Sequence, residues 1–200
     1  MDELQIYRNA WNTCIEMAKD RGFEVDQNYS LITDNDFKYM LFEKKIDIFA
    51  ENSDKTRAIF FKFVLAPKIK PSTIKVIIDE IKKECEYTNI DLIIILKSKP
   101  NNTITKIEKE YTTNIQIMWC KQLQFNITKH VLVPTHTKCN DEEINELLKT
   151  YNLLTKVQLP LISRDDPVIR YYNYKPGDVI KITGTKMSFN PNYEFYRTVK

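Results

Sequence analysis

The sequence predicts an α/β domain followed by a smaller α+β domain. In residues 1–128, short apolar and β-branched segments alternate with amphipathic helical segments of roughly 10 to 15 residues, which is typical of a layered α/β protein. From about residue 129 the chain changes to one helical segment and a Pro- and Tyr-rich stretch with strand-like pieces. We therefore expect two domains, 1–128 and 129–200.

Helical periodicity begins at the N-terminus. A helix is expected over residues 2–21, closed by a left-handed cap at Gly22. Thr33, with Asp36 three residues on, offers N-cap chemistry to a second helix over residues 34–45. Both helices precede the first expected strand.

The remaining elements of the first domain alternate between strands and helices. Ser72 is the expected N-cap of a third helix, and its buried stripe comprises Ile74, Ile77, Ile78, Ile81 and Cys85. A fourth helical stretch lies near residues 103–111. Strands are expected over residues 46–50, 58–65, 92–96 and 115–119. The run at 92–96 is wholly aliphatic, so we expect apolar cover on both of its faces.

The second domain is expected to contain a helix over residues 141–151. Strand-like pieces follow at 168–172, 178–183 and 193–199. The sequences Asp166-Pro167 and Pro176-Gly177-Asp178 are turn formers, so we expect them to set the geometry of the surface around them.

Composition excludes several classes of protein. The chain is 42% hydrophobic and 28% charged, which is ordinary for a globular protein. Its longest aliphatic run is far shorter than the roughly 20 residues that a membrane-spanning helix needs, and no secretion signal is visible. The four cysteines form no C-x-x-C pair and are expected to be reduced, mostly buried thiols of an intracellular protein. A net charge of +3 predicts at most local, weak contact with nucleic acid.

Two residue groups offer possible metal chemistry. His130, His136 and Cys139 lie within ten residues of one another and contain zinc's preferred ligand types, but no fourth ligand is near, so we expect histidines bonded to backbone. Asp47 and Lys62 lie on strands like those of restriction-type nucleases, where a second carboxylate would fall at Phe60. Because phenylalanine cannot ligate a cation, a related sheet without catalytic residues is expected.

Other catalytic constellations find no support in the residues. There is no G-x-S-x-G motif, and Cys139 has no obvious orienting acid. The only glycines are Gly22, Gly177 and Gly184, which excludes a Gly-rich phosphate loop. We expect neither covalent catalysis nor nucleotide binding.

Two surfaces could bind macromolecules. Lys68, Lys70, Lys75, Lys82 and Lys83 surround the third helix and either face a phosphate backbone or form a solvated face balanced by nearby acids. In the tail, Arg170, Tyr171, Tyr172 and Tyr174 combine with three prolines into a composition that is enriched at protein interfaces, although some of these tyrosines are expected in the core.

Four phrases stand in one order in the second domain: HVLVPTH at 130–136, QLPLISRDDPVIRYY at 158–172, KPGDVIKI at 175–182, and Tyr196-Arg197. Together they resemble the C-terminal assembly domain of the fifth subunit shared by eukaryotic RNA polymerases I, II and III, which is similar to the H subunit of archaeal RNA polymerase. WNTCIEMAKDRGF at 11–23, followed by Phe37, is similar to the opening helix of the eukaryotic subunit's N-terminal jaw domain, which the archaeal counterpart lacks. The resemblance therefore covers the whole chain and selects the eukaryotic type.

The resemblance implies a jaw domain over 1–128 with a nuclease-like sheet lacking catalytic residues, and an assembly domain over 129–200. It implies a non-catalytic subunit of DNA-directed RNA polymerase that docks through its C-terminal domain on the largest subunit and places its jaw near downstream duplex DNA. Contact with that DNA is expected to be weak and non-specific, and no cofactor, metal, small molecule or membrane partner is expected. A free-standing restriction-nuclease-like enzyme that binds DNA remains the alternative.

The motifs of the resemblance supply the expected interface residues. These are His130, Pro134, His136, Gln158, Leu159, Pro160, Ile162, Asp166, Pro167, Arg170, Tyr171, Gly177, Asp178, Tyr196 and Arg197. The expected DNA-proximal residues are Lys68, Lys70 and Lys75.

The sequence departs from the family pattern near its end. Gly184 stands near a position where the family has Arg, and Phe189-Asn190-Pro191-Asn192 is expected to make the last turn. This divergence and the richness in lysine and asparagine indicate a copy encoded by a large DNA virus, which would act in a cytoplasmic viral factory or virion. A cellular copy would act in the nucleus.

Overall fold

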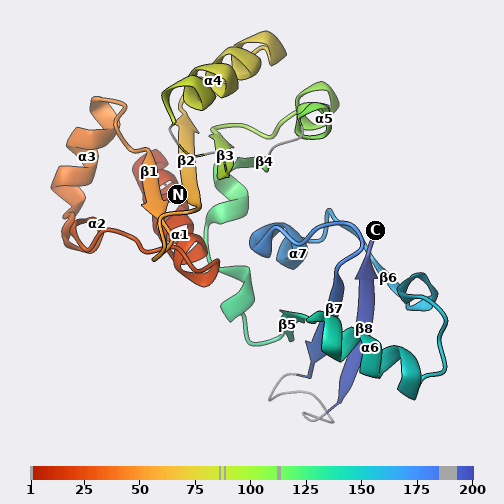
Figure 1. Ribbon diagram of the computed structural model, residues 1–200. Helices are drawn as coiled ribbons and strands as arrows, with labels where there is room; N and C mark the ends of the chain where they lie inside the picture. The colour runs from red at the N-terminus through yellow and green to blue at the C-terminus, as the bar shows by residue number, and fades with distance from the viewer. Residues whose placement is uncertain (1, 86, 88, 112–113, 185–192) are drawn as a thin grey trace. The chain divides into compact units, whose positions relative to one another are not determined.

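The chain folds into two units, residues 1–125 and 126–200, each with its own sheet and apolar core (Figure 1). The computed structural model describes residues 2–85, 87, 89–111, 114–184 and 193–200. Both units mix helices with strands, which confirms the expected α/β and α+β content. The division falls between residues 125 and 126, whereas the sequence placed it between 128 and 129.

The N-terminal unit is built on a four-stranded sheet in the order β1-β2-β3-β4. Strand β1 (Ile48–Glu51) runs antiparallel to β2 (Ala58–Val64), whereas β2, β3 (Ile90–Leu96) and β4 (Ile115–Trp119) run parallel to one another. All four expected strands are confirmed, with shifts of a few residues at some of their ends.

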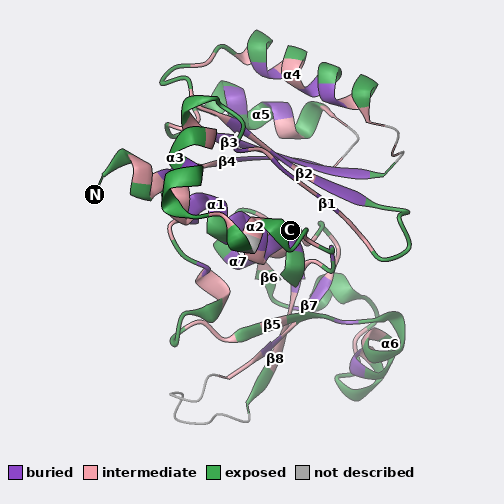
Figure 2. Cartoon of the chain, turned by 90° about the vertical axis from the view of Figure 1, so that its left-hand side faces the viewer, coloured by how far each residue is buried: buried purple, intermediate pink, exposed green. Residues whose placement is uncertain are grey.

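Strand β3 is buried along its entire length. Leu92, Ile94 and Leu96 pack in one apolar cluster with helices α4 (Pro71–Glu84) and α5 (Asn102–Glu110). Figure 2 shows α4 and α5 on one face of the sheet and α1 on the other. The expected cover on both faces of this strand is confirmed, and it explains why β3 needs no polar alternation.

Helix α1 (Glu3–Asp20) ends with the expected left-handed glycine. Gly22 has φ +83°, and the N–H groups of Gly22 and Phe23 donate to the carbonyls of Lys19 and Ala18, each at 3.0 Å. These two bonds form a Schellman motif, which satisfies the last carbonyls of the helix.

Arg8 joins α1 to the short helices α2 (Asn28–Leu31) and α3 (Asp34–Phe42). Its Nη2 donates to the Ile32 carbonyl at 2.6 Å, and its guanidinium lies 5.1 Å from the Trp11 ring centroid and 5.0 Å from that of Phe37. Both rings are fully buried. A guanidinium over aromatic faces is a favourable cation–π arrangement, so this contact fixes where α3 lies against α1.

Thr33 and Asp36 form the expected capping box of α3. The helix ends at Phe42 rather than at residue 45, which corrects the predicted range. The reason is that Lys44 takes a left-handed φ of +57°, and the Lys45 N–H turns back to the Met40 carbonyl at 2.8 Å. Lysine occupies the position that glycine usually takes, and no glycine marked this helix end in the sequence.

The sequence suggested Ser72 as the N-cap of α4, and this prediction is wrong. The N-cap is Lys70, and Pro71 occupies the first helical position, where its missing N–H costs nothing and its fixed φ suits the helix. Helix α5 begins at Asn102, with the side chain of Asn101 accepting a hydrogen bond from the Ile104 N–H at 2.9 Å. Asn101 is therefore the N-cap of α5.

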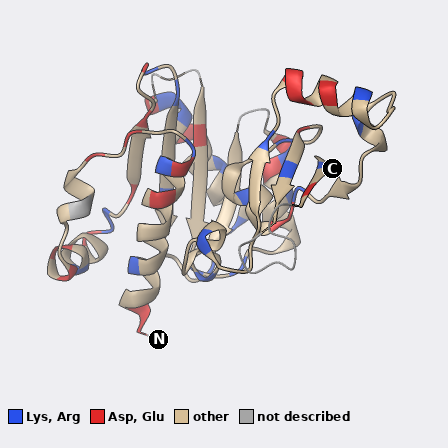
Figure 3. Ribbon diagram, turned by 90° about the horizontal axis from the view of Figure 1, so that it is seen from below, with Lys and Arg blue, Asp and Glu red and all other residues tan. Residues whose placement is uncertain are grey.

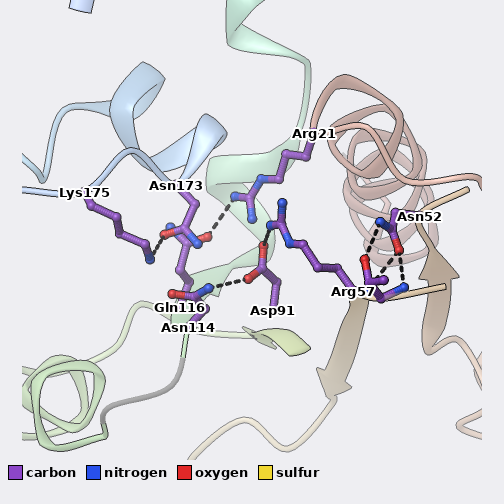
Figure 4. Close-up of polar contacts among 9 residues, drawn as sticks. Arg21, Asn52, Arg57, Asp91, Asn114, Gln116, Asn173 and Lys175 are labelled. Atoms are coloured by element: carbon purple, nitrogen blue, oxygen red, sulfur yellow. Dashed lines mark hydrogen bonds and ion pairs between the residues drawn. The ribbon is translucent and has the colours of Figure 1, made fainter. Parts of the chain in front are cut away.

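A polar network lies at the amino-terminal ends of the three parallel strands (Figure 4). Asp91 in β3 is only 3% exposed, and it accepts from Asn114 Nδ2 at 2.7 Å and from Arg57 Nη2 at 3.4 Å. Arg21 Nη2 donates to Gln116 Oε1 at 2.8 Å in the same N-terminal unit. A buried carboxylate requires such partners, so the network fixes how these strands begin.

The C-terminal unit has a second four-stranded sheet in the order β5-β7-β8-β6. Its strands are β5 (Thr135–Lys138), β7 (Val179–Thr183), β8 (Glu194–Val199) and β6 (Leu161–Ile162). Only β6 and β8 pair in parallel; the other neighbours are antiparallel. The sequence predicted β7 and β8 but missed the short strands β5 and β6.

Each face of the second sheet carries one helix. Helix α6 (Asp141–Thr150) contributes Leu147 to a cluster with Cys139, Leu159 and Val179. Helix α7 (Pro167–Tyr172) contributes Ile169 to a cluster with Ile180, Ile182 and Val199. The alternation of Val179 and Ile180 between the two clusters follows from the period-two geometry of a strand.

The expected strand over 168–172 is wrong, because this stretch is helix α7. Asp166 caps it: Oδ1 accepts from the N–H groups of Val168 at 2.8 Å and Ile169 at 3.3 Å, and Pro167 takes the first helical position. The β-branched and aromatic residues had suggested a strand, but N-cap and proline chemistry outweigh their propensity here.

Side-chain chemistry in the described residues agrees with the expected state of the cysteines. Cys14, Cys120 and Cys139 are buried, Cys85 is half-buried, and all four are free thiols. Burial raises the pKa of Cys120 to about 11, which keeps it protonated at neutral pH. No helix in the described part of the chain combines the length and apolarity that crossing a bilayer requires.

We expect Ile94→Ala to destabilise the N-terminal unit by about 2–5 kcal/mol, because Ile94 is fully buried in the central strand and its loss leaves a cavity. The exposed Val76→Ala, on α4, should change stability by no more than about 0.5 kcal/mol. Urea unfolding followed by circular dichroism measures both. Equal effects of the two substitutions would contradict the core assignment.

Candidate functional site

Asp47 and Lys62, considered above for a nuclease centre, form a closed ion pair. Lys62 Nζ lies 2.6 Å from Asp47 Oδ2, and the Phe63 N–H donates to Asp47 Oδ1 at 2.8 Å. Phe60 packs against the apolar cluster of α4, α5 and the sheet. Both carboxylate oxygens therefore have partners within the chain, and the pair ties the start of β1 to β2.

The two histidines of the HVLVPTH phrase bond to backbone, as expected. His130 Nδ1 accepts from the Leu132 N–H at 3.3 Å, and the His130 carbonyl accepts from the Val133 N–H at 2.9 Å. His136 Nδ1 lies 2.8 Å from the Pro134 carbonyl and must donate, since a carbonyl only accepts. No cluster of three or more His, Cys, Asp or Glu side chains suited to a metal occurs among the described residues. The histidines thus shape a tight loop.

Gln158 holds a second loop. Its Oε1 accepts from the N–H groups of Leu154 at 2.7 Å and Thr155 at 3.1 Å. Thr198 Oγ1 in β8 donates to the Lys156 carbonyl at 2.6 Å. Gln158 therefore holds the segment between α6 and β6 in its own turn, and Thr198 fastens that segment to the sheet.

The KPGD sequence makes the expected turn. The Asp178 N–H donates to the Lys175 carbonyl at 3.0 Å, and Gly177 has φ +89°, as the third residue of a type II turn requires. Asp178 Oδ2 accepts from the Lys175 N–H at 2.8 Å, and Asp178 Oδ1 pairs with Lys138 Nζ at 2.8 Å. This turn leads into β7. The expected turn at residues 189–192 lies outside the described residues.

The tyrosine-rich segment is more enclosed than its composition suggests. Tyr171 is 3% exposed, and Tyr172 stacks on Tyr174 with ring centroids 5.2 Å apart. Tyr174 Oη donates to the His136 carbonyl at 3.3 Å, and burial raises the pKa of Tyr174 to about 12. Arg170 is half-buried, with Nη1 lying 3.9 Å from an Asp165 carboxylate oxygen.

The expected interface residues thus divide by exposure. Leu159 and Tyr171 are buried, and Ile162 and Tyr196 pack against the two apolar clusters. Arg197 Nη1 donates to the Leu161 carbonyl at 2.9 Å. His130, Gln158, Pro160 and Pro167 are exposed. Many motif residues therefore build the unit's framework, whatever further contact they make.

Sequence reasoning missed a set of exposed apolar side chains in the C-terminal unit. They are Val131, Leu132, Tyr151, Leu154, Val157 and Leu161. Tyr151, Leu154 and Val157 lie between the phrases that drew attention to the tail, and the other three lie within them. They could have been recognised in the sequence as apolar residues in segments that show neither helical nor strand periodicity.

The expected DNA-proximal lysines do not have equal surroundings. Lys75 is ion-paired to Glu110, with Nζ 2.5 Å from Oε2, and this carboxylate raises the pKa of Lys75. Lys68 and Lys70 are exposed on the loop between β2 and α4, and neither side chain makes a hydrogen bond or ion pair with the described residues.

The topology adds further lysines to this edge of the first sheet. Parallel strands place their carboxyl ends together, so Lys97 and Lys99 after β3 and Lys121 after β4 join Lys68 and Lys70. Ser98 Oγ donates to the Pro67 carbonyl at 3.1 Å, which links two of the loops, whereas Lys97 Nζ pairs with Glu3 at 2.6 Å. We call Lys68, Lys70, Lys97, Lys99 and Lys121 the lysine edge.

Comparison with known proteins identifies the family. The model described as "RNA polymerase Rpb5, N-terminal domain" matches residues 2–81, and "RNA polymerase Rpb5, C-terminal domain" matches residues 125–199. The protein named DNA-directed RNA polymerase V subunit 5A of Arabidopsis thaliana is 31% identical, over 90% of this chain and 82% of its own length. The chain belongs to the Rpb5 family of RNA polymerase subunits. The predicted family is confirmed.

Other relatives match this Rpb5-family chain over at least 90% of both sequences. The protein named DNA-directed RNA polymerases IV and V subunit 5B of Arabidopsis thaliana is 29% identical, over 98% of this chain and 91% of its own length. The protein named DNA-directed RNA polymerases I, II, and III subunit RPABC1 of Caenorhabditis briggsae is 32% identical, over 90% of each chain. These relatives come from a plant and a nematode, and the viral origin stays a prediction.

We expect Asp166→Ala to lower the stability of the C-terminal unit by about 1 kcal/mol, because two helix N–H groups lose their acceptor. Asp166→Asn keeps an acceptor oxygen at the same place and should lose much less. Thermal unfolding of the full chain checks the difference. If the Asn variant is as unstable as the Ala variant, the carboxylate's charge rather than the cap matters.

Proposed function

We propose that this Rpb5-family chain is a non-catalytic, structural subunit of a DNA-directed RNA polymerase. It docks on the largest subunit through its C-terminal unit, an assembly domain, and holds its N-terminal unit, a jaw, near downstream duplex DNA during transcription. The proposal is carried by the ordered match of both Rpb5 domain models to one chain. Polymerase subunits that span nearly the same length support it.

The surroundings of Asp47 support a role without catalysis. Its two oxygens are bonded to Lys62 and to the Phe63 N–H, and the nearby Phe60 offers no ligand. Holding a divalent ion beside a scissile phosphate would need free carboxylate oxygens. We infer that the jaw keeps a nuclease-like sheet for shape alone, and that the subunit acts wherever its polymerase transcribes, which is the nucleus for a cellular enzyme.

The lysine edge supports weak contact with duplex DNA. Its members come from three separate segments that follow the carboxyl ends of the three parallel strands: two loops and the 3-10 helix Cys120–Leu123. Lysine acts on phosphates as a point charge that releases counterions, without reading sequence. Contact of this kind fits DNA that must slide past the subunit during transcription.

We expect a tagged full chain to retain the two largest polymerase subunits on affinity purification. Lysine cross-linking of that complex should join the largest subunit to Lys138, Lys149 or Lys156 of the C-terminal unit, because exposed lysines near an interface lie within reach of the partner. Mass spectrometry identifies the linked peptides. Recovery of polymerase with links only to residues 1–125 would refute the assignment of docking to the C-terminal unit.

Replacing Lys68, Lys70, Lys99 and Lys121 by Gln should weaken the grip of the assembled polymerase on downstream duplex DNA. The slope of log affinity against log salt should fall by about 0.9 for each phosphate that a lysine no longer neutralises. A control with Lys19, Lys38, Lys83 and Lys109 changed to Gln removes equal charge from exposed helix positions elsewhere in the same unit. Equal slopes for the two variants, measured by fluorescence anisotropy across a salt series, would exclude a DNA contact at the lysine edge.

A further inference from the structure

Strand β4 is the last strand of the first sheet, and its outer edge borders no other strand of the described residues. The sheet order is β1-β2-β3-β4, so β4 pairs with β3 alone. An open edge presents backbone N–H and C=O groups to which a strand of another chain can add. Each edge of a sheet therefore needs a feature that prevents such pairing.

The other edge strands in the described part of the chain are protected by their length or their charge. Strand β6 has only two residues, β1 carries Glu51 and β5 carries Lys138, and short length and charge both hinder strand addition. Charged residues are otherwise sparse in the strands, most of whose length is tan in Figure 3. Strand β4, with the sequence IQIMW, has five residues and no charge, and its first four residues are buried. Its edge therefore lacks both kinds of protection.

The pairing of β4 with β3 shows which of its backbone groups point outward. The Leu92 N–H in β3 donates to the Asn114 carbonyl at 2.8 Å, so the backbone groups of Asn114 point toward β3. Successive residues of a strand direct their N–H and C=O groups to opposite sides of the strand. The groups of Ile115, Ile117 and Trp119 therefore point away from β3, toward the open edge.

Two side chains accept hydrogen bonds from these outward N–H groups. The Ile117 N–H donates to Glu108 Oε1 at 2.5 Å, and the Trp119 N–H donates to Gln122 Oε1 at 3.3 Å. Glu108 lies on α5 and is half-buried, whereas Gln122 lies on the 3-10 helix Cys120–Leu123. A strand that added to β4 would have to displace both side-chain oxygens before its own carbonyls could take their place.

We propose that Glu108 and Gln122 close the outer edge of β4 against strand addition, and that β4 of a second copy of this chain is the strand they exclude. Two copies of an uncharged strand have no charges that repel each other. They present the same groups to each other, so they can pair antiparallel about a two-fold axis and join two sheets into one. The closure keeps the free chain monomeric, whichever complex the chain later enters.

The test compares the full-length wild-type chain with the double variant Glu108→Ala, Gln122→Ala by sedimentation velocity over a concentration series. The wild type should stay at the monomer mass of 23.8 kDa. The double variant should dimerise at least about tenfold more strongly, because its two outward N–H groups gain protein acceptors only when a strand adds. The matched control is Gln5→Ala with Glu110→Ala, which removes one exposed amide and one exposed carboxylate of the same unit and should stay monomeric.

A conservative variant separates the hydrogen bond from the charge. Glu108→Gln keeps an acceptor oxygen and removes the carboxylate charge, so it should remain monomeric. If it dimerises as strongly as Glu108→Ala, the charge rather than the hydrogen bond keeps the copies apart, and the proposal is wrong. A double variant that is folded by circular dichroism and still monomeric also overturns the proposal.

A measurement on the wild-type chain covers the case in which the substitutions unfold the unit. Amide hydrogen exchange of Ile117 and Trp119, followed by NMR, should be at least about tenfold slower than in an unfolded chain, because each N–H must leave its side-chain acceptor before it exchanges. The two rates should not depend on the concentration of the chain. Unslowed exchange would show an open edge, and exchange that slows as concentration rises would show that the wild-type edge already pairs; either result contradicts the proposal.

Discussion

The fold of the N-terminal unit depends on one constraint: strand β3 cannot face water on either side. Its seven residues are all buried, and five of them form an unbroken aliphatic run. A strand of this kind needs helices on both faces. The two crossovers between the parallel strands supply the helices of one face, and the N-terminal helix supplies the other. Helices α4 and α5 cover one face and α1 covers the other, so the positions of these helices follow from the strand they protect.

The same topology gathers charged side chains at both ends of the parallel strands. At the amino-terminal ends, the Asp91 carboxylate pairs with Arg57 and accepts a hydrogen bond from Asn114. These polar contacts hold the starts of the three parallel strands in register. At the carboxyl ends, β2 and β3 run into loops that carry lysine, and β4 runs into a 3-10 helix that carries Lys121. One end is thus closed by internal pairing, while the other offers positive charge to solvent.

In the C-terminal unit, polar motif residues act mainly on the backbone around them. His130 and Gln158 each accept hydrogen bonds from N–H groups two to four residues away, and Asp166 caps α7. His130 and Gln158 fasten loops in which Leu132 and Leu154 remain exposed, whereas the Val168 and Ile169 side chains beside the Asp166 cap are buried.

The sequence predicted the parts of the fold that periodicity or cap chemistry governs. The Thr33 capping box, the Gly22 cap and the aliphatic strand β3 were foreseen, because each depends on neighbours in the chain. Helix α7 was missed because its β-branched and aromatic residues outweighed the Asp166 cap in our reasoning. The sequence singled out Lys68 and Lys70 but not Lys97, Lys99 and Lys121, and it did not show which tail tyrosine is buried, since both depend on which distant segments meet.

The most direct test of the account is an electron cryomicroscopy map of polymerase purified through this chain on a DNA template with a downstream duplex. The account predicts residues 126–200 against the largest subunit and the lysine edge facing the duplex. A map in which the N-terminal unit makes the contact with the largest subunit, while residues 126–200 stand away from it, would contradict the account.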